Sequence, residues 1–194
     1  MAQELETRVR RARVSDAGKI AAFVNLARAG RVEVDERAII ERFGNVGFLL
    51  AERGGHLVGM LGWQVENLVV RVTDLLVWVY SPTLRVYSPT ASAPPHSSFL
   101  IPHSSFSERV VVGRALFAEM ERTATELQCE AALLFLRYPG SPQAAEFCKM
   151  LEYEPRIVAS LPKMWQEAAY EARISDDESV WIKQLRADRV VQPV

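Results

Sequence analysis

The chain has 194 residues, of which 49% are apolar and 24% are charged, and its formal net charge is −1. This composition is ordinary for a globular protein, so wholesale disorder is excluded, and the length predicts a single domain over residues 1–194. The near-zero net charge gives no reason to expect nucleic acid or an acidic membrane surface as a partner.

The two cysteines, Cys129 and Cys148, do not have the spacing of a metal site. We therefore expect a reduced, cytoplasmic protein that holds no metal. No apolar run approaches the roughly 18 residues that a membrane-spanning helix needs. Residues 1–14 also lack the apolar core of a signal peptide.

The first third of the chain predicts a strand, two helices and an antiparallel meander. Residues 9–14 form the strand, and Asp16 and Asp35 are helix caps for segments that end near Gly30 and Gly44. Three apolar strands with short connections follow, at residues 47–52, 56–66 and about 68–78. Gly54 and Gly55 form the first hairpin turn, and Gly59 and Gly62 mark bulges or relieve curvature.

Two tandem duplications follow the third of these strands. Val79–Thr83 recurs as Val86–Thr90, and Pro95–Phe99 recurs as Pro102–Phe106, each seven residues later. Because this segment is rich in serine and proline and unusually long for a connection, we expect residues 80–106 to be an inserted, flexible loop.

The segment from Ser107 to Arg137 organises the rest of the chain. A short apolar run and Gly113 precede a helical pattern of apolar residues three and four apart. Residues 131–136 then form a continuous apolar run, which is typical of a central strand buried on both faces. A loop, a helix with a glycine in its first turn and a central strand can together hold a phosphate, because the first amides of a helix are free donors.

The last part of the chain predicts two more helices and two more strands. Ser141 and Pro142 begin a helix that carries Phe147 and Cys148. A strand at residues 156–161, an amphipathic helix at 162–172 and a strand at 180–185 follow.

Two of these segments resemble the GNAT family of N-acetyltransferases. VVVGRALFAEMERTATELQCEAALLF resembles the family's acyl-CoA-binding segment, with Gly113 to Leu116 as the matching core. SPQAAEFCKMLEYEP resembles the family's later helix, and the order of elements matches over about residues 9–185. The resemblance implies an α/β fold: a mixed, mostly antiparallel sheet of six to seven strands with helices on both faces.

The match to the family's motifs is incomplete. Glu108 stands where arginine or glutamine is usual, and Val111 stands where a glycine is usual. An alternative alignment, with Gly113 and Ala115 as the Gly-x-Ala pair, places Val110 at the basic position. In the later segment Ser141, Cys148 and Glu152 replace Asn, Tyr and Gly.

The resemblance also implies where a cofactor would bind. Acetyl-CoA would be the co-substrate, with its pantetheine arm against the main chain of Leu76 and Val77. Its pyrophosphate would meet the main-chain amides of the helix start, with Arg109 or Arg114 adding charge. The expected amides are those of Val111, Val112, Gly113, Arg114 and Ala115.

Acyl transfer to an amine needs a base, and the departing thiolate benefits from an acid. Asp74 is the first candidate for the base and Glu66 the second, because both lie on strands expected to flank the cleft. Cys148 occupies the position at which the family often has a tyrosine acid. Solvated polar side chains and a small buried core residue are the alternatives for these three positions.

Two functions follow from this comparison. The first is an acyl-CoA-dependent N-acyltransferase, in which a primary amine of a small molecule or peptide attacks acetyl-CoA directly in a ternary complex. The second is a catalytically inactive relative that binds a ligand or a partner through the same cleft, which the substitutions motivate. Contact between two copies through the helix that carries Trp165 would make a homodimer.

Overall fold

The computed structural model describes residues 6–28, 33–78, 106–135 and 142–186. The duplicated segment therefore lies outside the described residues, except that Phe106 belongs to a helix. Within these ranges no helix is both long enough and apolar enough to cross a membrane.

A seven-stranded sheet runs through the molecule in the order β1-β2-β3-β4-β5-β7-β6. All neighbouring strands are antiparallel except β4 and β5, which are parallel. The expected mixed, mostly antiparallel sheet is confirmed. The strands are β1 (Arg8–Arg11), β2 (Gly47–Arg53), β3 (His56–Glu66), β4 (Val69–Val77), β5 (Ala131–Leu134), β6 (Glu154–Ile157) and β7 (Ser179–Gln184).

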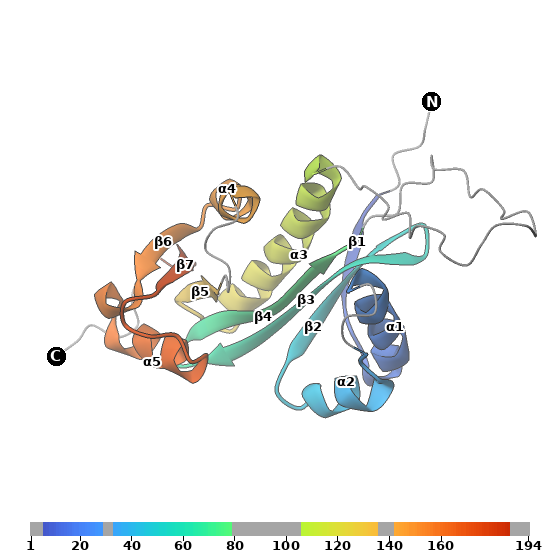
Figure 1. Ribbon diagram of the computed structural model, residues 1–194, viewed down its shortest axis with the longest axis horizontal. Helices are drawn as coiled ribbons and strands as arrows, with labels where there is room; N and C mark the ends of the chain where they lie inside the picture. The colour runs from blue at the N-terminus through green and yellow to red at the C-terminus, as the bar shows by residue number, and fades with distance from the viewer. Residues whose placement is uncertain (1–5, 29–32, 79–105, 136–141, 187–194) are drawn as a thin grey trace, which may run out of the picture.

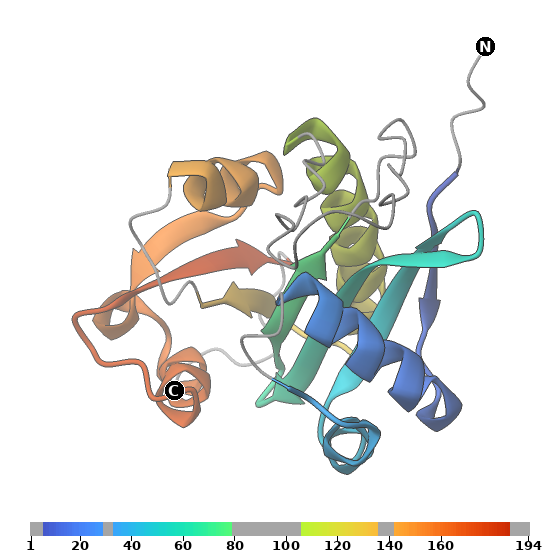
Figure 2. The same cartoon turned by 45° about the vertical axis from the view of Figure 1, so that its right-hand side comes forward.

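Helices cover both faces of the sheet (Figures 1 and 2). Helices α3 and α4 pack on one face, whereas α1, α2 and α5 pack on the other. Two short 3-10 turns, η1 (Val14–Asp16) and η2 (Val158–Ser160), precede α1 and α5. The helices are α1 (Ala17–Ala27), α2 (Glu36–Arg42), α3 (Phe106–Glu126), α4 (Pro142–Met150) and α5 (Lys163–Glu171).

Both expected bulges are present beside their glycines. The β2–β3 register shifts next to Gly59, and the β3–β4 register shifts next to Gly62, where Thr73 is the extra residue on β4. The second bulge matters for function, because it redirects the side chains of β4 just before the strand ends.

Helix α3 begins several residues earlier than the sequence pattern indicated. The run Val110–Val112 lies within the helix, whereas we expected the helix to start near Gly113. Valine costs a few tenths of a kcal/mol in a helix relative to alanine. Burial of Val110 and Val112 against the sheet outweighs this cost, because each buried valine contributes about 1.5 kcal/mol or more.

An ion-pair network fastens the first strand to the first helix. Arg10 Nη1 and Nη2 each lie 2.8 Å from the Asp16 carboxylate, and Nη2 lies 3.0 Å from Glu52 Oε1. Lys19 Nζ is 2.7 Å from the same Glu52 oxygen. The hydrogen bonds from Arg10 lower the pKa of Asp16 from 3.8 to about 2.

This shift predicts how acid affects stability. Because the folded-state pKa of Asp16 lies below its unfolded value, the stabilisation is complete above the unfolded value and is lost as the pH falls from about 4 towards 2. Asp16→Asn should lower the free energy of unfolding at neutral pH by about 1–2 kcal/mol. It should also make the melting temperature fall less steeply in that acid range. Glu41→Gln, at an exposed pair with Arg37, is the control, and parallel curves for all three proteins would contradict the assignment.

Candidate functional site

The central strands β4 and β5 separate part-way along their length. They pair only between Val69–Val72 and Ala131–Leu134, after which β4 continues alone on that side to Val77. The amide of Trp78 donates to Val58 O at 2.8 Å, so alternate residues of β4 bond to β3. The main-chain groups of Leu75 and Val77 therefore point away from β3, into the space where β5 would otherwise lie.

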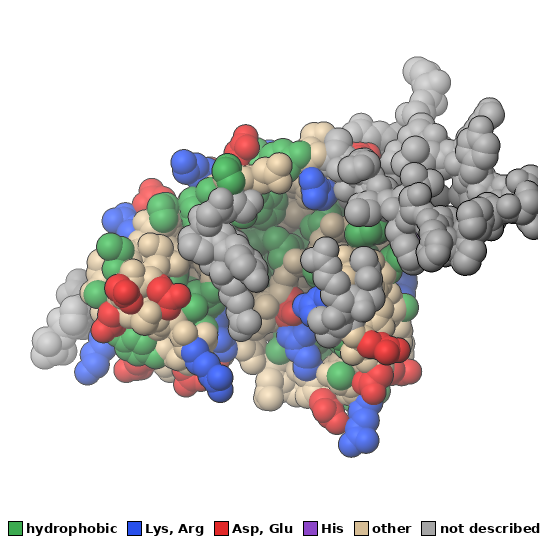
Figure 3. Space-filling view, in the orientation of Figure 1, with side chains coloured by type: hydrophobic (Ala, Val, Ile, Leu, Met, Phe, Trp, Pro, Cys, Tyr) green, Lys and Arg blue, Asp and Glu red, His purple; other side chains and the backbone are tan. Residues whose placement is uncertain are grey.

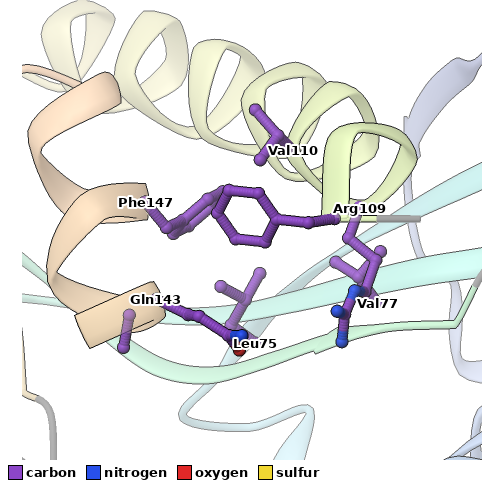
Figure 4. A pocket seen from close by; sticks show the side chains of 8 residues that line it. Leu75, Val77, Arg109, Val110, Gln143 and Phe147 are labelled. Atoms are coloured by element: carbon purple, nitrogen blue, oxygen red, sulfur yellow. The ribbon is translucent and has the colours of Figure 1, made fainter. Parts of the chain in front are cut away.

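A pocket of about 280 Å³ lies at this separation, between the end of β4 and the first turns of α3 and α4. Its walls are mostly apolar, and only Arg109 and Gln143 among its side chains are polar. In Figure 4, Phe147 projects from α4 towards α3, and Arg109 extends from α3 alongside Val77. The lining residues are Leu75, Val77, Phe106, Arg109, Val110, Gln143, Ala144 and Phe147.

Asp74 lies beside the pocket, on the opposite face of the sheet. Arg42, the last residue of α2, donates to both carboxylate oxygens of Asp74, and its Nη1 lies 3.3 Å from Asp74 Oδ1. The Arg42 guanidinium also lies over the ring of Phe48. Thr73 Oγ1 donates to Asp74 Oδ2 at 2.9 Å. Gly62 makes room for the carboxylate, because a Cβ at that position would lie 2.7 Å from Asp74 Oδ2. Figure 3 shows a hollow bordered by hydrophobic side chains in the middle of the view, with a group of acidic and basic side chains below it.

The solved structures that resemble this chain share one fold. No family model and no curated protein matches the sequence. Among solved structures, an acetyltransferase of the GNAT family from Staphylococcus aureus Mu50 superposes with a TM-score of 0.61 at 12% identity, over 93% of this chain and 100% of that one. The chain has the GNAT fold.

Two further GNAT-fold neighbours were solved with the expected co-substrate or its product. The PaiA N-acetyltransferase from Thermoplasma acidophilum, in complex with coenzyme A, has a TM-score of 0.56 at 10% identity over 93% of this chain and 99% of that one. YncA from Salmonella typhimurium, a putative acetyltransferase with acetyl-CoA, has a TM-score of 0.56 at 13% identity over 94% and 95% of the two chains.

Within this GNAT fold, the amides expected to bind pyrophosphate are not at the helix start. Val111 to Ala115 lie in the second and third turns of α3, where each amide bonds to the carbonyl four residues earlier. The described helix instead begins at Phe106, so the positive end of its dipole lies at its first turn. Glu108, an acidic residue in that turn, was the sequence signal for the earlier start.

The two arginines proposed to add charge have different surroundings. Arg109 lines the pocket and makes no ion pair within the described part of the chain. Arg114 instead donates to Met150 O at 3.1 Å and lines a second cavity, further along α3 and α4. Of these two arginines, Arg109 is the one that brings a positive charge to the pocket.

Gly113 serves packing between α3 and α4. A Cβ on this residue would lie 2.6 Å from Phe147 Cζ, so the glycine lets the phenyl ring rest directly on the helix backbone. The same ring packs edge-on against Phe117, with centroids 5.9 Å apart. Phe147 was matched to the family only by type, and its role as a wall of the pocket depends on this contact.

Of the two strand residues expected at the cofactor, Val77 lies at the pocket and Leu76 does not. Val77 lines the pocket, but the side chain of Leu76 packs under α1 and α2 on the other face. Leu75 takes the expected place beside Val77. The bulge at Thr73 sets which residues face the pocket, and strict alternation along the strand does not reveal it.

Neither Glu66 nor Cys148 lies at the pocket. Glu66 ends β3 at the β3–β4 turn, where it pairs with Val69, and lies several residues along the hairpin from the pocket. Cys148 is fully buried in the core between α3, α4 and the sheet. Burial raises the pKa of its thiol to about 12, so it is a poor proton donor, and it is not among the lining residues.

The packing role of Gly113 predicts a specific destabilisation. Gly113→Ala should lower the free energy of unfolding by about 1–3 kcal/mol, because the added methyl group forces Phe147 out of its position. Adding Phe147→Leu should restore part of the loss in denaturant unfolding. Gly44→Ala, at a site with open space around it, is the matched control and should cost nothing. A Gly113→Ala protein as stable as the parent would show that the helices do not need this close approach.

Proposed function

We propose that the protein is an acyl-CoA-dependent N-acyltransferase that transfers an acetyl group from acetyl-CoA to a primary amine. The separation of β4 and β5 next to the start of α3 carries this proposal, because it leaves main-chain groups and a mostly apolar pocket side by side. Neighbours with the same fold from Thermoplasma and Salmonella, solved with coenzyme A and acetyl-CoA, support the choice of co-substrate.

The residues of the pocket fit the parts of acetyl-CoA. The pantetheine arm, an amide-containing chain, would lie between Phe147 and β4 and pair with the main-chain groups of Leu75 and Val77. The pyrophosphate would lie at the first turn of α3, where the helix dipole and the Arg109 guanidinium both favour negative charge. Gln143, at the start of α4, adds a polar side chain to the wall.

Asp74 is the residue that can take the proton from the amine. The amine nitrogen forms a bond to the thioester carbonyl carbon, its proton passes to Asp74 directly or through a water, and the carbon–sulfur bond breaks. The thiol of coenzyme A is acidic enough to leave as a thiolate, so a protein acid is not required. Arg42 holds the carboxylate in place by its two-nitrogen contact.

Ligand binding can be tested without an acceptor. Acetyl-CoA at millimolar concentration should raise the melting temperature, since a ligand that binds only the folded state stabilises it. Arg109→Gln should weaken acetyl-CoA binding about tenfold or more and shrink the shift, because a charged contact is lost. Arg114→Gln is the matched control and should leave the shift unchanged. If neither acetyl-CoA nor free CoA shifts the melting temperature, the proposal fails.

The role of Asp74 predicts a loss of rate with binding retained. Asp74→Asn keeps the shape and the hydrogen bond to Thr73 but removes the base, so kcat should fall about 10²- to 10⁴-fold. The acetyl-CoA thermal shift should stay the same, because Asp74 does not line the pocket. Thiol release measured over a range of pH gives the rate, and an unchanged kcat would assign Asp74 a purely structural pairing with Arg42.

A second function, ligand binding without turnover, has one observation in its favour. The position of the family's acid holds Cys148, whose thiol is buried and away from the pocket, and none of the described side chains that line the pocket is an acid. An acetyl-CoA thermal shift together with no thiol release from any amine would favour this alternative. Thiol release with any amine would exclude it.

A further inference from the structure

The sheet face opposite α3 carries two separate hydrophobic clusters with polar side chains between them. One cluster lies under α1 and α2, and the other lies under α5 at the far end of the sheet. Figures 1 and 2 show these helices at opposite ends of the face, with β4 running between them. We call the intervening residues the polar seam: Arg42, Gln64, Glu66, Arg71 and Asp74.

Arg71 is the least exposed cation of the seam, with only 14% of its side chain accessible. Its Nη2 donates to Gln64 Oε1 and Glu66 Oε1, both at 2.8 Å. Its Nε is buried without an acceptor, and Nη1 makes no hydrogen bond within the described structure. The two contacts through Nη2 fix the plane of the guanidinium, so the remaining donors have a set direction.

A guanidinium held in this way has unused capacity for an anion. Leaving charged donors unmatched at a mostly buried site is unfavourable, and a carboxylate oxygen is a strong acceptor for a guanidinium N–H. The seam pairs two cations, Arg42 and Arg71, with two carboxylates, Asp74 and Glu66. Because its formal charge is balanced, a ligand carrying one positive and one negative group leaves it balanced.

The two halves of the seam lie on the same strand. Arg71 and Asp74 are three positions apart on β4 and face the same side of the sheet, with the bulge at Thr73 between them. At about 3.3 Å per residue their Cα atoms are separated by at most about 10 Å. A small molecule can therefore meet the Asp74 carboxylate with its amine and the Arg71 guanidinium with its other end.

We infer that the acceptor is a small amine that also carries a carboxylate, such as an amino acid, and that Arg71 binds this carboxylate. The inference rests on the proposed acyl transfer and names the class of its second substrate. Asp74 receives the amine proton at one end of the seam. Arg71 positions the acceptor at the other end and takes no part in the bond changes.

The test compares acceptors that differ only in the carboxylate. Glycine is paired with glycinamide, and glutamate with its α-amide, and thiol release from acetyl-CoA gives kcat/KM for each. The acids should be better acceptors by about 10- to 100-fold, which is what one charged hydrogen-bonded contact contributes. Arg71→Gln should remove the preference mainly through KM. Arg37→Gln, at an exposed arginine of α2, should keep it.

Two further variants separate recognition from folding. Arg71→Gln leaves Glu66 without its partner, so the double variant Arg71→Gln/Glu66→Gln restores neutrality and should fold while still lacking the preference. Glu66→Gln alone keeps Arg71 and should keep the preference. A preference that survives in the double variant would overturn the inference.

The outcomes also distinguish this inference from the proposed function. If acetyl-CoA shifts the melting temperature and the amides react as well as the acids, the carboxylate site is wrong and acyl transfer stands. If no acyl-CoA binds, the proposed function is wrong. Binding of N-acetylglycine against N-acetylglycinamide, measured by thermal shift without turnover, still tests Arg71, and equal shifts would overturn its role.

Discussion

The separation of β4 from β5 is the constraint on which the rest of the structure depends. A sheet normally satisfies its main-chain donors and acceptors by pairing, and here the pairing stops after Val72 and Leu134. The bulge at Thr73 turns β4 as it leaves its neighbour, and the first turns of α3 and α4 close the space on one side. The pocket, the start of α3 and the polar seam all lie around this interruption of the hydrogen bonds between β4 and β5.

The interruption also divides the site between the two faces of the sheet. On the side of α3 and α4 the walls are mostly apolar, and Arg109 is the only charged side chain among the described lining residues. On the other face the two hydrophobic clusters lie at the ends of the sheet, and the ion pairs of the polar seam lie between them. For the proposed acyl transfer, an acyl carrier and an amine have opposite requirements of polarity, and the two faces offer one environment suited to each.

Most of the fold was predictable from the sequence, and the errors have identifiable causes. The glycines of the hairpin turn, the alternating strand patterns and the apolar run at residues 131–134 predicted the sheet, because these signals are local. The start of α3 was wrong, since the β propensity of Val110–Val112 gave way to tertiary burial. The ion pair of Arg42 with Asp74 joins segments 32 residues apart, and no local pattern reveals it. Cys148 occupied a family position whose chemistry depends on exposure, which the sequence does not show.

Arg42 links the orientation of a helix to the aim of a functional carboxylate. It is the last residue of α2, and its guanidinium is fixed both by Asp74 and by the ring of Phe48. A tilt of α2 would move Arg42 and so alter the contact that holds the Asp74 carboxylate. For the proposed acyl transfer, acceptor choice and reaction rate would therefore not be independently adjustable, because a lineage that reshapes α2 also alters the contact that holds the proposed base.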